Sequence, residues 1–210
     1  MNIETIRTEA LGKLGRNIVN FSKIEGFLKY WLPTTKIEGN IVKSSELPDK
    51  LLVNRAKNSK KTLGNLVRYF NENILGDTIQ SDFPEDDSGQ VSISFNISCS
   101  DKEFLERKKQ EFLDVVAERN KLIHQDLANL DTSSIEDYRR LIIYLDEQNP
   151  RLLNYLAELG EIVNIQKDLL KDCLELIEDA LETNTDTVVY IKLDTLTAEQ
   201  ATQLFYELYQ

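Results

Sequence analysis

The chain has 210 residues, of which 41% are hydrophobic and 8% aromatic, and its net charge is −11. This composition excludes a disordered chain and suits one domain, or one domain with an appendage. No apolar run approaches the ~18 residues of a membrane helix, and the first residues lack an apolar signal core. Cys99 and Cys173 are too few for a disulfide framework and lack zinc-site spacing. We therefore expect a cytoplasmic protein with no membrane partner, metal or cofactor.

The charge is distributed unevenly along the chain. Residues 1–75 carry 13 Lys and Arg against 7 Asp and Glu, whereas residues 76–210 carry 12 against 29. The acidic total argues against a broad electrostatic attraction to nucleic acid. Two interpretations of the first part stay open: a local basic surface, or ordinary solvated helix faces.

The N-terminal part has the spacing of an amphipathic helix. Apolar residues three and four apart from Ile3 to Trp31 predict one long helix. Pro33 ends this helix, because the residue before a proline is disfavoured in helical geometry. We expect a loop over residues 34–46.

A second helix is predicted over residues 48–74, with a proline in its first turn. It contains the densest basic stretch of the chain, which includes Lys57, Lys60 and Lys61. These lysines are candidates for guiding RNA, and the alternative is a solvated helix face.

The middle of the chain combines a loop, a strand and a helix. Residues 76–90 are polar and acidic with Gly and Pro, which indicates a surface loop. Residues 91–98 alternate apolar and polar side chains, the period of a half-buried strand. Ser100 and Glu103 form a capping box that opens a helix through Ile123.

The C-terminal part begins with a long helical stripe. The capping box Ser133–Glu136 opens a helix, and Asn149–Pro150 either caps a new helix or kinks the first one. The apolar stripe continues to about Glu182. Residues 187–193 are β-branched and apolar, which predicts a second strand, and residues 197–209 predict a short last helix.

The predicted fold is mainly α: a helical bundle with a small β appendage. We expect a helical domain over residues 1–182 with a loop and strand insertion at 76–100, and a strand–helix appendage over 183–210. The strands near 91–98 and 187–193 can pair. Because a two-stranded ribbon is marginal alone, it should pack on a helix or on another chain.

The single histidine of the chain, His124, follows Arg119 and Asn120 in a predicted helix. At ~100° per residue, Arg119 and His124 lie roughly 140° apart on an ideal helix, whereas Asn120 and His124 share a face. The helix must therefore end or bend near Ile123, or a second copy of the chain must contribute across an interface, if Arg119 and His124 act on one phosphate.

These residue types suit the chemistry of RNA cleavage. Histidine accepts and donates protons near neutral pH, and the planar donors of Arg119 match phosphate oxygens. Asn120 can orient the imidazole or donate to a phosphate. RNA carries its own nucleophile, the 2′-hydroxyl, so no metal is required. The alternative is that His124 is an ordinary packed or surface histidine.

This pattern of Arg119, Asn120, three residues and His124 resembles the motif of the HEPN superfamily of ribonucleases. The match covers about ten residues, within a helical context over 1–182. The resemblance implies a HEPN-like bundle and a metal-independent endoribonuclease whose paired motifs form one cleft in a homodimer. Arg119, Asn120 and His124 would then be catalytic. The substrate-binding residues that we expect for RNA are Lys121, Lys57, Lys60 and Lys61.

The resemblance also implies a biological role as a toxin or defence effector, with an antitoxin or defence-system protein as partner. One subgroup, paired with nucleotidyltransferase antitoxins, has a tyrosine two residues after the histidine. This chain departs from that pattern with Asp126, which can hold the imidazole or be a solvated residue that ends the helix. The alternative function is a non-catalytic HEPN-like module that binds RNA or a protein.

Overall fold

The computed structural model describes most of the chain and is mainly helical, as the sequence predicts. The residues that it describes are 2–40, 47–76, 90–97, 101–182 and 190–194. The α-helices of this part are α1 (Ile3–Trp31), α2 (Leu47–Ser59), α3 (Leu63–Asn73), α4 (Lys102–Lys121) and α5 (Ile135–Glu182). Its strands are β1 (Lys36–Asn40), β2 (Gln90–Asn96) and β3 (Tyr190–Asp194). A 3-10 helix, Leu32–Thr34, follows α1, and a π-helix, Leu122–Asp126, follows α4.

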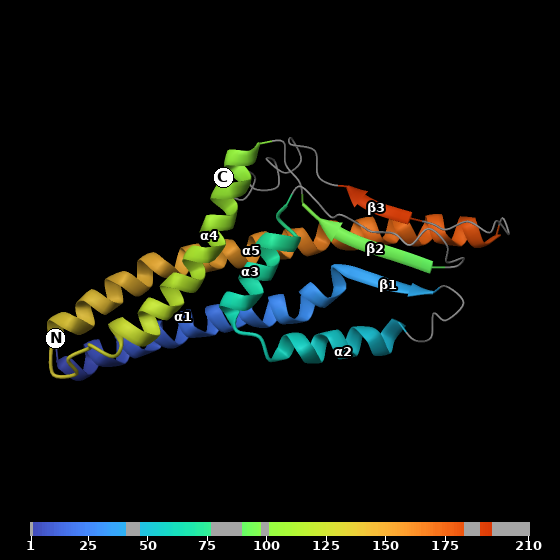
Figure 1. Cartoon of the computed structure of the whole chain (residues 1–210). Coiled ribbons are helices and arrows are strands. Elements are labelled where there is room, and N and C mark those ends of the chain that lie inside the picture. Colours follow the sequence, from blue (N-terminus) through green and yellow to red (C-terminus); the bar gives the residue numbers. More distant parts are fainter. Residues whose placement is uncertain (1, 41–46, 77–89, 98–100, 183–189, 195–210) are drawn as a thin grey trace.

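The two longest helices, α1 and α5, lie side by side and run parallel (Figure 1). Their contact includes buried polar groups. Asn17 Nδ2 donates to Leu145 O at 2.9 Å and to Gln148 Oε1 at 3.1 Å, and Trp31 Nε1 donates to Gln166 Oε1. Because each buried amide has a partner, the pairing fixes the register of the two helices without leaving an orphaned polar group there.

Helix α4 packs between α5 and α3 and runs antiparallel to both. Asn71 Nδ2 of α3 donates to Lys109 O of α4 at 2.9 Å. At the other end of α3, a Cβ on Gly64 would lie 3.4 Å from Val116 Cγ1, so the two helices approach closely there. This antiparallel pairing places the beginning of α3 beside the end of α4.

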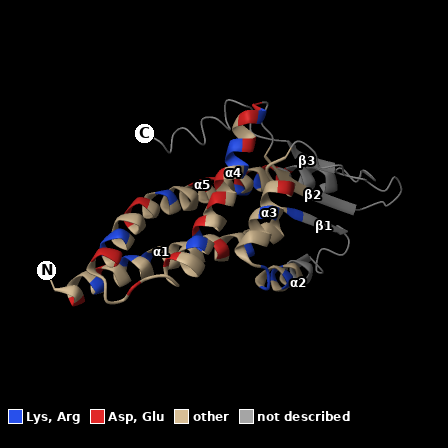
Figure 2. Ribbon diagram, turned by 60° about the vertical axis from the view of Figure 1, so that its left-hand side comes forward, with Lys and Arg blue, Asp and Glu red and all other residues tan. Residues whose placement is uncertain are grey.

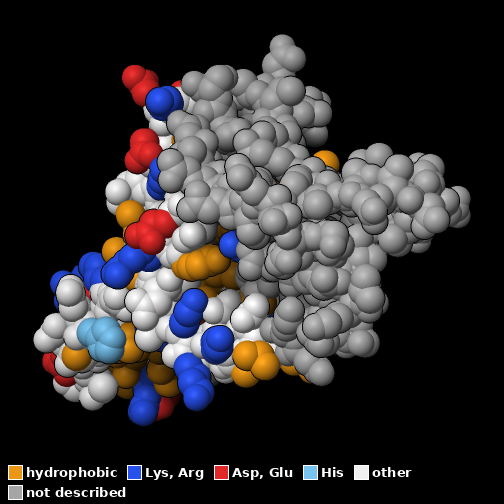
Figure 3. Space-filling view, turned by 45° about the vertical axis from the view of Figure 1, so that its right-hand side comes forward, with side chains coloured by type: hydrophobic (Ala, Val, Ile, Leu, Met, Phe, Trp, Pro, Cys, Tyr) orange, Lys and Arg blue, Asp and Glu red, His pale blue; other side chains and the backbone are white. Residues whose placement is uncertain are grey.

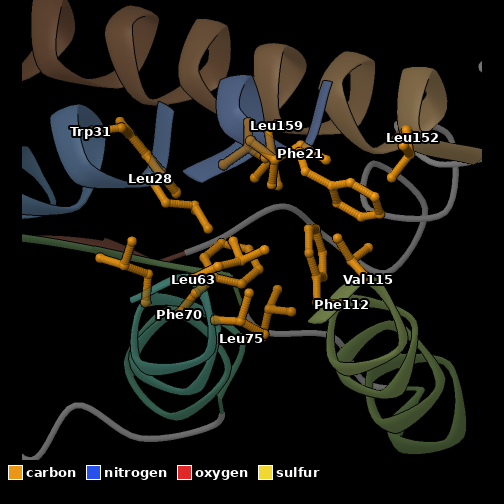
Figure 4. Packing of buried hydrophobic residues seen from close by; sticks show 14 of the residues in the cluster. Phe21, Leu28, Trp31, Leu63, Phe70, Leu75, Phe112, Val115, Leu152 and Leu159 are labelled. Atoms are coloured by element: carbon orange, nitrogen blue, oxygen red, sulfur yellow. The ribbon is translucent and has the colours of Figure 1, made fainter. Parts of the chain in front are cut away.

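The hydrophobic core lies between a layer of α1 and α5 and a layer of α3 and α4 (Figure 4). Phe70 and Phe112 meet with ring centroids 4.8 Å apart, and Phe70 also contacts Trp31 at 5.9 Å. Tilted and edge contacts of this kind are the favoured geometry for aromatic pairs. Within the described part, no helix is long and apolar enough to cross a membrane.

The strands form a sheet in the order β1-β2-β3, with β1 antiparallel and β3 parallel to β2. Phe95 joins this sheet to the bundle: its N–H donates to Thr35 O at 2.7 Å, and its ring packs on Trp31. Both segments predicted as strands, near 91–98 and 187–193, contain one. The prediction of a loop over 34–46 is wrong where β1 pairs with β2, because Gly39 and Asn40 have weak strand preference and mask the strand in the sequence.

Two predicted helix boundaries are corrected. The helix predicted over residues 48–74 is divided into α2 and α3, because Thr62 caps α3: its Oγ1 accepts from Asn65 N at 3.4 Å. The cap of α4 is Asp101 rather than Ser100, since Asp101 Oδ1 accepts from Phe104 N at 2.9 Å.

The start and the middle of α5 also differ from the prediction. Its cap is Ser134 rather than Ser133, because Ser134 Oγ accepts from Asp137 N at 3.1 Å. Pro150 does not begin a new helix but lies inside α5. The predicted loop at 77–89 and the last helix at 197–209 lie outside the described residues.

Candidate functional site

The Arg–Asn–His motif spans the point where α4 ends and the π-helix begins. Leu127 N donates to Leu122 O at 3.1 Å, a hydrogen bond over five residues instead of four. Such π turns are rare and occur frequently at functional sites. Because the wider turn brings residues five apart closer to one face, it reduces the angular separation of Arg119 and His124. The expected change of the helix near Ile123 is therefore present.

The three motif side chains are accessible. Asn120 and His124 are exposed, and Arg119 is half-buried. Arg119 Nη1 donates to Asn120 Oδ1 at 3.4 Å, and its guanidinium forms no ion pair within the described part of the chain. Figure 3 shows the only histidine, in pale blue, at the surface. The arrangement leaves cationic donors and an imidazole available to a ligand.

The position of Arg119 on the apolar stripe of α4 has a simple structural reason. Phe112 is fully buried, whereas Val116 and Ile123 are only partly buried. Arg119 therefore lies where the stripe reaches the surface. Because Arg119 is only partly buried, the full cost of burying an unpaired charge is avoided.

Glu118 fixes the orientation of α4 immediately before Arg119. Its carboxylate accepts from Gln148 Nε2 at 3.0 Å and from Arg151 Nε at 3.1 Å, both on α5. Gln148 is itself held by Asn17 of α1. No local spacing in the sequence indicates the role of Glu118, because its partners lie 30 and 33 residues away.

Lys121 is held by an ion pair that spans the π turn. Its Nζ lies 2.9 Å from Asp126 Oδ2 and 4.3 Å from the centre of the Tyr144 ring. The hydrogen bond that Lys121 donates to the Asp126 carboxylate raises the pKa of Lys121 above its usual value. Asp126 thus binds Lys121 and makes no bond to His124 within the described residues, so it does not hold the imidazole here.

The other lysines expected to bind substrate lie at the end of α2 and in the α2–α3 junction. Lys57 and Lys60 are exposed, and Lys61 Nζ lies 4.9 Å from the centre of the Tyr69 ring. Since Gly64 packs against Val116, the junction lies at the same end of α4 as the motif. Lys57 lies further along α2.

The charges around the motif are consistent with a local basic surface. Figure 2 shows basic residues on α2 and interspersed charges on α1, α4 and α5. Lys and Arg side chains also lie on the face that carries the histidine (Figure 3). Basic side chains therefore lie near the histidine on the described part of this face of an acidic protein.

A second charged cluster lies in the interior, half-way along α4. Lys108 Nζ lies 2.8 Å from Glu111 Oε2 and 3.0 Å from Glu158 Oε1, and the Lys108 and Glu158 side chains are 4% and 2% exposed. Burial lowers the pKa of Lys108, but its bonds to both carboxylates raise it on balance. Burial raises the pKa of Glu158. This cluster joins α4 to α5 and was not predicted from the sequence.

A surface hollow of about 470 Å³ lies beside the motif, between the π-helix and the first turns of α5. The hollow is lined by Lys121, Gln125, Asp126, Asn129, Leu130, Asp137, Arg140, Leu141 and Tyr144.

Among the described residues, no group of three His, Cys, Asp or Glu side chains is placed to hold a metal ion.

No protein-family model, curated protein or solved structure matches this chain. The resemblance to HEPN ribonucleases thus depends on the motif residues and on the helical arrangement around them.

Proposed function

We propose that this protein is a metal-independent endoribonuclease of the HEPN type, acting as a toxin or defence effector. The observation that carries the proposal is the placement of Arg119, Asn120 and His124 at the surface end of α4, where the helix widens into a π turn. The anchoring of Glu118 by α5 supports it, because a fixed helix end holds the donors in place.

The cleavage step needs only proton transfer and charge stabilisation. An imidazole takes the proton of the 2′-hydroxyl as the 2′ oxygen bonds to phosphorus, and the bond from phosphorus to the 5′ oxygen breaks. A protonated imidazole gives a proton to that leaving oxygen. The products are a 2′,3′-cyclic phosphate and a 5′-hydroxyl. The guanidinium of Arg119 stabilises the negative charge that grows on the phosphate oxygens.

The proposal includes a homodimer, in which residues 101–126 and 134–145 face their symmetry mates. A two-fold interface brings two copies of Arg119 and His124 together, so that one imidazole acts as base and the other as acid. Sedimentation at micromolar concentration should give a mass of twice 24.2 kDa. A strictly monomeric species would contradict this part of the proposal.

The proposed function is tested with purified protein, mixed RNA and EDTA. Wild-type protein should cleave, His124→Ala should not, and Arg7→Ala should cleave like wild type. Arg7 is an exposed arginine on α1, outside the proposed interface, and among the described residues it pairs with Glu4 of its own helix at 3.7 Å, which makes it a matched control for the preparation.

Two results of this assay would count against the ribonuclease. Equal cleavage by wild type and His124→Ala indicates a contaminating nuclease or another site. RNA binding without cleavage by wild type favours the non-catalytic RNA-binding module instead.

A further inference from the structure

The hollow beside the motif lies next to the row of residues that would act on the phosphate. Asn120 and His124 form one row along the end of α4, and Lys121 and Gln125 form the adjacent row. Lys121 and Gln125 both line the hollow. If a phosphate of the RNA lies at His124, a base attached beside that phosphate can therefore reach the hollow.

The charged groups of the hollow are already paired with one another. Lys121 is bonded to Asp126, and Arg140 is bonded to Asp137. A site for a phosphate would offer unpaired cations, whereas this one has two ion pairs that balance. Its electrostatics favour an uncharged polar ligand.

The polar groups that remain for a ligand are carboxamides. Asn129 Nδ2 donates to Gln125 O at 2.8 Å, which fixes the side chain and leaves its oxygen as an acceptor. The Gln125 side chain is exposed and makes no hydrogen bond within the described residues. Carboxamides of Asn and Gln present a donor and an acceptor together, the pattern that base edges match.

The apolar part of the hollow includes Leu130, Leu141 and the ring of Tyr144. Tyr144 is held in place, because its hydroxyl accepts from Gln148 Nε2 at 3.1 Å and Lys121 covers its ring. The hollow, of about 470 Å³, is open to the surface, so a base in it is only partly enclosed. Unpaired bases of RNA are generally bound by such combinations of apolar contact and edge hydrogen bonds.

We propose that this hollow binds one unpaired nucleobase of the RNA, next to the phosphate at Arg119 and His124. Because most of its lining belongs to residues 101–126 and 134–145, which face the symmetry mate in the proposed homodimer, the hollow then opens into the cleft that the two copies form. Gln125 and Asn129 hydrogen-bond the edge of the base, while the apolar side chains of Leu130 and Leu141 contact its faces. The inference rests on the proposed function and adds a specificity: the enzyme acts on single-stranded RNA, because a paired base cannot enter the hollow.

The test measures binding by fluorescence anisotropy, with short 2′-O-methyl RNA that cannot react by 2′-hydroxyl attack. In a set of otherwise identical strands, one abasic position is moved along the sequence. Wild-type protein should lose affinity by about fivefold or more at one abasic position. Gln125→Ala and Asn129→Ala should weaken binding of the intact strand and lose this sensitivity to the abasic position.

Gln110→Ala is the matched control, since Gln110 is an exposed glutamine on α4 that lines a different hollow. It should bind all strands like wild type. Failure of wild type to bind RNA, equal affinity for every abasic strand, or an abasic effect that persists in Gln125→Ala would each overturn the base site. Because binding is measured without cleavage, base recognition by a protein that does not cleave would refute the ribonuclease and leave this site standing.

Discussion

The middle of α4 buries one charged residue, Lys108, against α5, whereas its C-terminal end keeps the motif at the surface. Lys108 is 4% exposed and lies between two carboxylates. Arg119 is half-buried with only a long hydrogen bond to the neighbouring Asn120, and His124 is exposed. The same helix therefore carries one charged group satisfied from within the chain and another available to a ligand.

This difference separates stability from function along a single helix. Burial of ions costs several kcal/mol each unless partners compensate, so Lys108 and Glu158 depend on each other. Exposed groups such as His124 cost little when changed, because water replaces their contacts. Glu118 joins the two regions, since its bonds to α5 hold the turn that carries Arg119.

The largest expected effects are on cleavage. His124→Ala and Arg119→Ala should each reduce the rate by about 10²–10⁴-fold, with the free energy of unfolding unchanged within about 0.5 kcal/mol. Arg119→Lys should rescue little, because an ammonium lacks the planar pair of donors. Asn120→Ala should do less damage. Single-turnover rates measure the loss of cleavage, and urea titrations measure the free energy of unfolding. A motif variant that unfolds would contradict the separation of stability from function along α4.

The next effect is on stability alone. Lys108→Met leaves Glu158 buried without its cation, so the free energy of unfolding should fall by about 3–5 kcal/mol in urea titrations at neutral pH. The double variant Lys108→Met/Glu158→Leu should recover most of this loss. If the double variant is no more stable than the single one, the pair does not carry the stability assigned to it.

The loss in Lys108→Met should also depend on pH. Burial raises the folded-state pKa of Glu158 above its ordinary value of 4.5, so the folded state binds this proton more tightly than the unfolded chain. The stabilisation of the folded state by this bound proton is fully present below pH 4.5, and it is lost as pH rises through the folded-state pKa of Glu158. Lys108 lowers this pKa in the wild type, so its removal raises the pKa of Glu158 further. The difference in stability between Lys108→Met and wild type should therefore be smaller in mild acid than at neutral pH.

A smaller effect is expected at Glu118. Glu118→Ala removes the acceptor of Gln148 and Arg151, which should cost roughly 1–3 kcal/mol of stability. It should also lower kcat with little change in KM, because Arg119 is less well positioned. Glu106→Ala is the matched control: Glu106 is exposed and pairs only with Lys109 of its own helix in the described part. Equal effects of the two substitutions would refute the positioning role.

The smallest effect concerns the lysines of the α2–α3 junction. Lys60→Ala and Lys61→Ala should each weaken RNA binding modestly and reduce the slope of log affinity against log salt by about 0.7. Lys171→Ala, at an exposed site on α5, should leave the slope unchanged. If all three variants have the slope of wild type, the lysines of the α2–α3 junction do not contact the RNA backbone.

Local patterns in the sequence predict α1 and most of α4 and α5, but not the division of residues 48–74 into α2 and α3. The periodicity from Ile3 to Trp31 predicts α1. If Arg119 and His124 act on one phosphate, their spacing predicts either a helix that ends or bends near Ile123, where the π-helix occurs, or a contribution from a second copy. Ile18 is an exception, because it belongs to the predicted stripe yet is 36% exposed, while the neighbouring Asn17 is buried.

What the sequence could not predict depends on partners far along the chain. Asn17 is buried because α5 offers Leu145 O and Gln148, about 130 residues away. Strand β1 forms because β2 pairs with it, although its own residues have weak strand preference. The roles of Lys108 and Glu118 likewise need the packing of α4 on α5.

The central claim is that the motif cleaves RNA by attack of the 2′-hydroxyl. The most direct measurement is the chemical identity of the new 3′ ends formed from a defined RNA in EDTA, by mass spectrometry, with wild type and His124→Ala compared. The account predicts 2′,3′-cyclic phosphate ends with wild type, none with His124→Ala, and no cleavage where a 2′-O-methyl group replaces the attacking hydroxyl. New ends that carry a free 3′-hydroxyl, or cyclic ends that persist in His124→Ala, would contradict it.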